Sequence, residues 1–529
     1  MPIDCIHYQQ SGYFSELITD YLDQKIALQS LYNRFPLIEN FKDQILEKQS
    51  NYNNNHRVNL VSVLQKQYNQ VQISDLTKQN IEALASPKTF TVTTGHQLNL
   101  FTGPLYFLYK IISTINLTAE LKSKYPEYYF VPVYWMATED HDFEEINYFN
   151  FKGKKIRWNT QSKGPVGRLS TEGLDKIIEV FASELGAGTN ANTIKKLFKE
   201  TYLFHNNLAD ATRHLANELF GKDGLVILDA DHSDLKLAFI PYIKEELLYK
   251  TAQKSVLKTT ELLKDYKVQV NPREINLFYL ENDLRERIIF EDGIYKVHNT
   301  SIHFSEKEIL TLLESNPEKF SPNVIMRPLY QEVILPNLCY IGGGGEIAYW
   351  LELKAYFTKV NVTFPMLLLR NSVLLATEKQ AKKADQLKLS WTDLFMKQPD
   401  LINLKVTEFS AFPVDLNLQK TALEEQFDYL KQIALQTDPS FLGAVKAQEA
   451  KQIKGLVNLE KRLLKAQKRK HEDALKRLTD LQNELFPNHS LQERIVNFSE
   501  IYLNHPQIIS RCFKTLQPLS NRFEIIVLE

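Results

Sequence analysis

The stretch TFTVTTGHQLNLFTGPLY, residues 89–106, joins a strand to a helix within a few residues. Its first half is a run of β-branched and apolar residues that stops at Gly95, which predicts a buried strand. Gly103 and Pro104 then begin a helical sequence, with proline in the first turn, where its missing N–H is not needed. A strand that turns directly into a helix is typical of α/β proteins.

Three further stretches repeat this pattern of a strand followed by a helix or loop. They are residues 129–136 (YFVPVYWM), residues 224–232 (GLVILDADH) with a helix predicted over 234–251, and residues 337–350 (NLCYIGGGGEIAYW). The alternation predicts an α/β fold with a parallel sheet covered by helices. Ligands of such sheets bind outside the carboxyl ends of the strands. Pro132 argues against a regular central ladder for the second stretch.

The regions around these strands differ in character. Residues 13–85 predict helices, because their apolar residues recur at helical spacing. The predicted organisation is a core over 1–370 with insertions at about 153–220 and 281–320, a helical coiled-coil arm over 371–487, and a C-terminal segment over 488–529 that returns to the core.

After Pro439 the apolar residues of the arm recur at an almost regular heptad spacing, which indicates a coiled coil. A single copy would expose Leu463, Leu478, Leu481 and Leu485 to water, so we predict a homodimer through residues near 440–486. Between residues 451 and 477, ten Lys or Arg stand against three acids. That excess is either a solvated helix face or an anion or nucleotide site where the arm meets the core.

Composition narrows the class of protein. The 529 residues are 43% hydrophobic and 24% charged, as in ordinary globular proteins, and the net charge of −1 gives no basic excess for nucleic acid. Cys5, Cys339 and Cys512 form neither a disulfide framework nor a zinc pattern. We see no signal peptide or membrane span, so we expect a cytoplasmic protein with no membrane partner.

The strand-to-helix turn in residues 94–104 is the first candidate site. Exposed backbone N–H groups at the start of a helix attract phosphate, and His96 could donate to a phosphate and offset charge in a transition state. The alternative is a tight turn with a packed histidine. The candidate residues are Thr94, Gly95, His96, Gln97, Thr102 and Gly103.

Acidic loops follow the next two strands. Glu139, Asp140, His141 and Asp142 could hold an amine, orient a general base or ligate a metal, or could be an exposed acidic loop. Asp231 is a further candidate for ligand binding, with helix capping as the alternative.

A glycine run marks the fourth strand-to-helix turn. Glycine lets the backbone approach a ligand closely, so Gly342, Gly343, Gly344 and Gly345 with Glu346 predict a phosphate or carboxylate cradle. The order matches neither a Walker loop nor G-x-G-x-x-G. Upstream, Arg327 adds a cation that could hold carboxylate or phosphate, or could form a structural salt bridge.

Together these strings resemble a known family. TGHQLNLFTGPLY, PVYWMATEDHDFEEIN, RPLYQE with GGGGEIAYW, and LQERI at residues 491–495 follow one another as in the bacillithiol biosynthesis cysteine-adding enzymes, the BshC family. The resemblance covers nearly the whole chain. It implies a Rossmann-like core similar to class I aminoacyl-tRNA synthetases, with insertions, and a coiled-coil domain used for dimerisation.

The reaction that the resemblance implies joins cysteine to glucosaminyl-malate through an amide. A carboxylate is a poor acyl donor, so we expect ATP or another nucleotide to activate it, with Mg²⁺ as a possible companion and no dedicated metal site. The attacking amine must be neutral, which calls for a base near the carboxylate-rich loops. Asp140, His141, Asp142 and His96 are the predicted catalytic residues, and Asp140 or Asp142 could seat the cysteine ammonium.

Two other functions stay open at this stage. One is a metal-dependent hydrolase that uses His141, His232 and neighbouring carboxylates. The other is a non-catalytic, nucleotide-binding dimeric scaffold.

Overall fold

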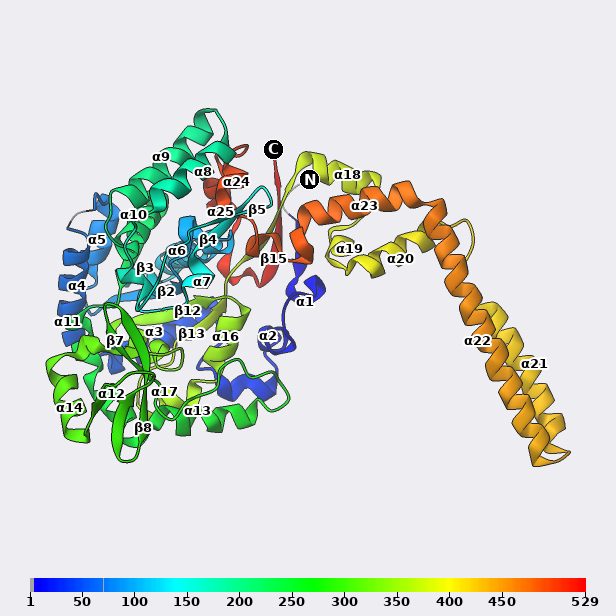
Figure 1. The fold of residues 1–529 in the computed structure, drawn as a ribbon, viewed down its shortest axis with the longest axis horizontal. Coiled ribbons are helices and arrows are strands. Elements are labelled where there is room, and N and C mark those ends of the chain that lie inside the picture. The colour runs from blue at the N-terminus through cyan, green and yellow to red at the C-terminus, as the bar shows by residue number, and fades with distance from the viewer. Residues whose placement is uncertain (1–3, 70) are drawn as a thin grey trace.

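A five-stranded parallel sheet lies at the centre of the protein (Figure 1). The computed structural model describes residues 4–69 and 71–529. The strand order is β13 (Met366–Leu369), β12 (Asn337–Gly342), β2 (Thr89–His96), β3 (Tyr129–Met136) and β6 (Val226–Asp229), and every neighbouring pair is parallel. The predicted α/β fold with a parallel sheet is therefore confirmed, and β13 is the one strand of this sheet that the sequence did not predict.

The position of β3 corrects one expectation. Pro132 lies in a strand with a neighbour on each side, β2 and β6, although proline usually occupies sheet edges. The ladder to β6 begins only at Val133, so Pro132 removes no donor from that ladder. The sheet thus accommodates the proline by starting one of the two pairings just after it.

Helices cover the sheet. α6 (Tyr106–Lys124) runs between β2 and β3 and packs on both, burying Leu108, Ile111 and Ile112. The helix predicted over 234–251 is divided into α11 (Ser233–Lys236), a 3-10 turn and α12 (Ile240–Tyr249). Pro241 explains the break, because it has no N–H to continue the preceding helix.

The N-terminal region is helical, as predicted, and more helices follow the later strands. These helices are α1 (Tyr8–Ser11), α2 (Glu16–Leu22), α3 (Phe41–Asn51), α4 (Asn55–Gln67), α5 (Asp75–Ala83), α7 (Phe143–Ile146), α13 (Thr251–Leu262), α15 (Arg327–Ile334), α16 (Gly344–Leu351), α17 (Lys354–Lys359), α24 (Phe498–Tyr502) and α25 (Ile508–Thr515).

Two further units lie between strands of the central sheet. Between β3 and β6 are the hairpin β4 (Tyr148–Phe151) and β5 (Lys154–Arg157) and the helices α8 (Leu174–Leu185), α9 (Thr189–Leu203) and α10 (Leu208–Phe220). Before β12 comes an antiparallel sheet of β7 (Leu277–Glu281), β8 (Leu284–Glu291), β9 (Ile294–Val297), β10 (His303–Phe304) and β11 (Phe320–Pro322), with α14 (Glu306–Ser315). Both units contribute to the surroundings of the site described below.

The C-terminal strand joins the two ends of the chain. β15 (Arg522–Leu528) lies between β1 (Asp4–His7) and β14 (Ser372–Thr377), antiparallel to the first and parallel to the second. The apolar residues of β15 are buried in this small sheet. This agrees with the prediction that the apolar C-terminal segment returns to the core.

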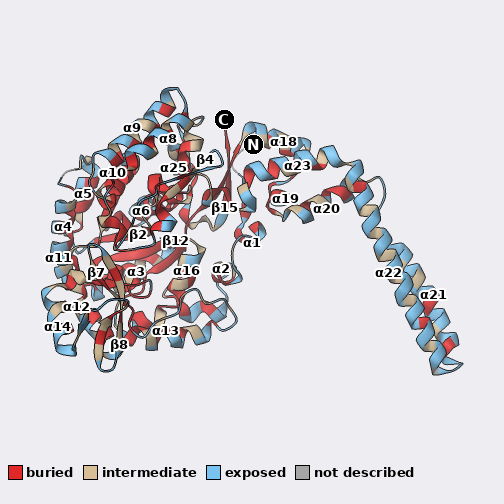
Figure 2. Cartoon of the chain, in the orientation of Figure 1, coloured by how far each residue is buried: buried red, intermediate tan, exposed pale blue. Residues whose placement is uncertain are grey.

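The helical arm projects from the body as a pair of helices. α21 (Asn417–Leu435) and α22 (Pro439–Lys470) pack side by side along their length, and their surfaces are mostly exposed (Figures 1 and 2). α18 (Glu378–Gln386), α19 (Trp391–Phe395), α20 (Gln398–Phe409) and α23 (Glu472–Leu485) connect this pair to the body.

The heptad argument for the arm is wrong in its second half. The helix breaks at His471, and Leu478, Leu481 and Leu485 on α23 are fully buried within this one chain. They belong to the main hydrophobic core and need no second copy to cover them. The apolar side chains left in water lie instead on α21 and α22, among them Tyr429 and Leu459.

We predict that Leu481→Ala lowers the free energy of unfolding by about 2–5 kcal/mol, because it leaves a cavity in the core. The matched control is Leu459→Ala on α22, which is 54% exposed and should change stability by less than about 0.5 kcal/mol. Denaturant unfolding measures both. Equal losses would mean that α23 does not belong to the core.

Candidate functional site

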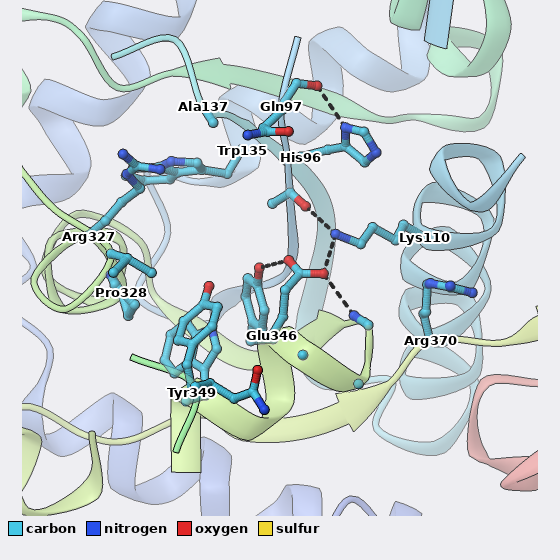
Figure 3. Close-up of a pocket in the computed structure, with 18 of the residues that line it drawn as sticks. His96, Gln97, Lys110, Trp135, Ala137, Arg327, Pro328, Glu346, Tyr349 and Arg370 are labelled. Carbon is cyan, nitrogen blue, oxygen red and sulfur yellow. Dashed lines mark hydrogen bonds and ion pairs between the residues drawn. The ribbon is translucent and has the colours of Figure 1, made fainter. Parts of the chain in front are cut away.

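A cavity of about 690 Å³ opens at the carboxyl edge of the central sheet, and we call it the edge cavity (Figure 3). Segments that follow β2, β3, β12 and β13 contribute to it, together with α6, α15 and α16. Its position is the one that parallel sheets favour for ligands.

Several of the residues singled out in the sequence meet here. Those that line the edge cavity are Gly95, His96, Gln97, Asp140, Arg327, Gly343, Gly344, Gly345 and Glu346. Those that do not line it are Thr94, Thr102, Gly103, His141, Asp142, Asp231 and Gly342. Thr94, for example, is buried in the sheet and donates to the Ile341 carbonyl at 2.8 Å. Ligand binding by any of these residues stays a prediction.

Glu346 is engaged by groups of the protein itself. Its carboxylate accepts hydrogen bonds from the Gly343 N–H at 2.8 Å and the Tyr340 hydroxyl at 2.6 Å, and it pairs with Lys110 Nζ at 2.5 Å (Figure 3). Lys110 also donates to the Gly95 carbonyl at 2.7 Å. Burial raises the pKa of Glu346, but Lys110 together with the hydrogen bonds from Tyr340 and the Gly343 N–H outweighs burial, so the pKa is lowered. Glu346 therefore stays charged and braces the glycine turn against β2.

Lys110 was missed in the sequence because it lies within the apolar helix α6. A lysine among Leu108, Ile111 and Ile112 is a detectable signal, since a buried ammonium requires a partner. The sequence did not indicate which carboxylate that partner would be.

His96 differs from its predicted role. It is 6% exposed, and its Nδ1 lies 2.7 Å from the Gln97 carbonyl, so Nδ1 carries the proton. Burial, aided by the Lys110 charge, lowers the pKa of His96 to about 3. A lowered pKa favours the neutral ring near pH 7, which argues against the predicted role of offsetting negative charge, while contact of His96 with a ligand stays a prediction. Its buried Nε2, which has no partner in residues 4–69 and 71–529, is an acceptor.

Asp140 is held by two guanidinium groups. Arg327 Nη1 lies 3.2 Å from Asp140 Oδ2, and Arg285 Nη1 lies 3.5 Å from Oδ1. Burial raises the pKa of Asp140, but the two arginines lower it further, to about 2. The carboxylate is therefore ionised at all physiological pH values and is a weak base.

The neighbours of Asp140 do not line the edge cavity. Glu139 is buried and forms an ion pair with Lys236, and burial raises its pKa despite that lysine. His141 Nδ1 lies 2.6 Å from Arg285 Nη1, and Asp142 is exposed. The three residues thus have different environments, although the sequence presents them as one cluster with Asp140.

Asp231 binds Arg168 through both carboxylate oxygens, each at 2.8 Å. The alternative prediction that Asp231 caps a helix is wrong, because His232 is the N-cap of α11 and accepts from the Asp234 N–H. Within residues 4–69 and 71–529, no three His, Cys, Asp or Glu side chains are grouped so that they could hold a metal ion.

A loop segment forms another wall of the edge cavity. Gln269 and Val270 line it, and the Gln269 N–H donates to Glu352 Oε1 at 2.7 Å. Glu352 is fully buried, and burial raises its pKa from 4.5 to about 7. The wall is therefore attached to a carboxyl group that titrates near neutral pH.

The fold and the edge cavity define a Rossmann-like α/β protein with a helical coiled-coil extension and a polar cavity at the carboxyl edge of its sheet. The chain belongs to the BshC family of bacillithiol biosynthesis. The family's N-terminal Rossmann-like domain matches residues 1–371, and its C-terminal coiled-coil domain matches residues 373–528.

Relatives named "Putative cysteine ligase BshC" match along the whole length. The protein from Flavobacterium johnsoniae is 69% identical over 100% of both chains, and that from Flavobacterium psychrophilum is 64% identical over 99% of both. A Bacillus cereus relative is 29% identical over 95% of both. No helix in the described residues has the length and apolar character needed to cross a membrane.

We predict that Glu352→Gln stabilises the protein at pH 8 and has little effect at pH 4. The folded pKa of about 7 lies above the ordinary 4.5, so the wild type loses stability as pH rises from 4.5 through 7. Glutamine removes the buried charge and keeps an acceptor for Gln269, for a gain of up to about 3 kcal/mol. Denaturant unfolding at both pH values measures it. A gain of equal size at pH 4 would contradict the assignment.

Proposed function

We propose that this protein is a cytoplasmic ligase that adds L-cysteine to glucosaminyl-malate, the last step of bacillithiol biosynthesis. Membership of the BshC family supports the reaction class. The observation that carries the proposal is the charge of the edge cavity, which carboxylates and cations line together.

A site that binds an amino acid needs both anionic and cationic groups, because the amino acid carries an ammonium and a carboxylate. Asp140 and Glu145 provide anionic groups for an ammonium, and Arg327 and Arg370 lie on opposite sides of the edge cavity (Figure 3). The volume of about 690 Å³ lies in the range of small-molecule sites. The aromatic walls formed by Trp135 and Tyr349 would exclude water from a bound substrate.

Amide formation requires an activated carboxylate, and a bound nucleotide would supply a leaving group for the carboxylate oxygen. The turn at Gly343, Gly344 and Gly345 fits an anionic group, because the amides of the first turn of α16 face no intrahelical acceptor. The basic helix α22 is the second position that we propose for a nucleotide.

Glu145 is the carboxylate best placed to act as the base. Asp140, with a pKa of about 2, would accept a proton poorly. Glu145 also lines the edge cavity, accepts from Gln97 Nε2 at 2.9 Å, and has no cation within 4.0 Å among the described side chains. It could take the proton of the attacking sugar amine. Asp140 would then serve mainly to hold the cysteine ammonium.

We predict that Asp140→Asn lowers bacillithiol formation about tenfold to a hundredfold, the loss expected for one charge-assisted hydrogen bond. Asp142→Asn is the matched comparison, since Asp142 is exposed and outside the edge cavity. Rates and melting temperatures of both variants are measured with cysteine, glucosaminyl-malate and ATP. Full activity of Asp140→Asn would remove this loop from the site. If the wild type forms no product, the ligase proposal is contradicted, and the alternative of a non-catalytic, nucleotide-binding scaffold is favoured.

We also propose a homodimer through the arm, residues 371–487, using the exposed apolar side chains of α21 and α22. Tyr429 and Leu459 are 67% and 54% exposed. We predict that Tyr429→Glu with Leu459→Glu halves the mass measured by light scattering, because charge at an interface core opposes association. Phe204→Glu, 74% exposed on the body, is the control and should keep the wild-type mass. An unchanged mass in the double variant would exclude this surface.

A further inference from the structure

Arg370 is a buried arginine whose Nε atom has no hydrogen-bond partner among the described residues. It follows β13 and is 3% exposed. Its Nη2 donates to Glu493 Oε1 at 2.7 Å, and its Nη1 donates to the Asn371 carbonyl at 2.9 Å and to Ser372 Oγ at 3.1 Å. Its Nε–H finds no acceptor in residues 4–69 and 71–529. A buried N–H without a partner is costly, so it points to a group that this chain does not contain.

The unused donor faces the glycine turn. A Cβ atom added at Gly343 would lie 3.4 Å from Glu346 Oε2 and 3.8 Å from Arg370 Nε, so the unused donor and the Glu346 carboxylate border the same side of Gly343. The charge of that carboxylate is offset by its ion pair with Lys110. Just beyond lie the amides of Gly344 and Gly345, the first residues of α16. First-turn amides and the helix dipole attract anions. A guanidinium N–H and a helix N-terminus therefore border the same part of the edge cavity (Figure 3).

A second arginine comes from the C-terminal segment. Arg494 lines the edge cavity and is exposed, and no carboxylate lies within 4.0 Å of its guanidinium in the described part of the chain. The preceding residue, Glu493, is the partner of Arg370 and also accepts from the Val373 N–H at 3.1 Å. One short segment thus binds Arg370 through Glu493 and contributes a second arginine, Arg494, to the lining of the edge cavity.

The cations of the edge cavity are otherwise committed. Lys110 is paired with Glu346, and Arg327 with Asp140. The centroid of the Tyr106 ring lies 5.1 Å from the Arg370 guanidinium carbon, and this cation–π contact helps to fix the arginine side chain. The unused cationic capacity is therefore the Arg370 Nε–H together with the whole guanidinium of Arg494.

We propose that Arg370 and Arg494 form an oxyanion subsite with the N-terminus of α16, which binds a carboxylate or phosphate group of a ligand. Glu493 is the positioning residue that aims Arg370. This proposal adds a ligand-binding subsite to the proposed ligase, and the identity of the ligand rests on that proposed function. Both the malyl carboxylates of the sugar substrate and the phosphates of a nucleotide have the chemistry that these donors recognise.

The test measures binding to the full-length protein by calorimetry, with L-malate and ADP as separate probes. Arg494→Gln is the main variant, because an exposed side chain can be changed without harm to the fold. Arg370→Lys keeps the charge and removes the Nε–H. Arg522→Gln, exposed at the start of β15 and outside the edge cavity, is the control for loss of one positive charge.

We expect Arg494→Gln and Arg370→Lys to weaken at least one probe about tenfold to a hundredfold, while Arg522→Gln binds as the wild type does. Weaker malate binding alone identifies a carboxylate site, and weaker ADP binding alone identifies a phosphate site. The proposal is overturned if neither probe binds the wild type at 10 mM (roughly the weakest affinity of interest), if Arg494→Gln binds both unchanged, or if the control weakens equally. A wild type that binds a probe through these arginines but makes no product would refute the ligase and keep the subsite.

Discussion

The buried ammonium of Lys110 is the interaction on which the site depends. It joins three elements that are far apart in the sequence: α6, the end of β2 through the Gly95 carbonyl, and the start of α16 through Glu346. An ammonium in a water-poor interior is tolerated only with such partners, so the three elements are fixed relative to one another. Because Glu346 also binds the Gly343 N–H, the glycine turn is held open in one shape. The neutral state of His96 is a further consequence of the Lys110 charge and of burial.

The charged groups around the edge cavity fall into two classes: those paired with an opposite charge of the protein, and those without such a partner. Asp140 is neutralised by Arg327 and Arg285, and Asp231 by Arg168. These pairs shape the walls and hold them at fixed separation. The Arg370 Nε–H has no such partner among the described residues, whereas Asp140 would bind a ligand ammonium alongside its two arginines. Counting the charged residues of the sequence could not make this distinction.

The C-terminal segment ties the second family domain to the site in the first. Glu493 and Arg494 belong to the part of the chain that matches the coiled-coil domain. Glu493 nevertheless binds Arg370 of the Rossmann-like domain, and Arg494 lines the edge cavity. β15 strengthens this return by pairing with β1 near the start of the chain. The projecting helices α21 and α22 contribute no residue to the edge cavity, and they expose apolar side chains such as Tyr429 and Leu459 to solvent.

Local sequence determined the elements and their order. β-branched runs, glycine turns and helical periodicity predicted β2, β3, β6, β12 and most helices, because these signals act over a few residues. The rule that parallel strands present ligands at their carboxyl ends placed Gly95, Asp140 and the glycine turn at one edge of the sheet.

Tertiary structure alone decided which charges meet. The partner of Lys110, the partners of Asp140 and the role of Arg370 depend on contacts between residues hundreds of positions apart, as with Arg370 and Glu493. The burial of Leu478 and Leu481 likewise depended on how α23 packs on the body, which a heptad pattern does not describe. An apolar stripe on a helix indicates that this face is buried against another surface. Only the tertiary structure shows whether that surface belongs to the same chain or to a partner.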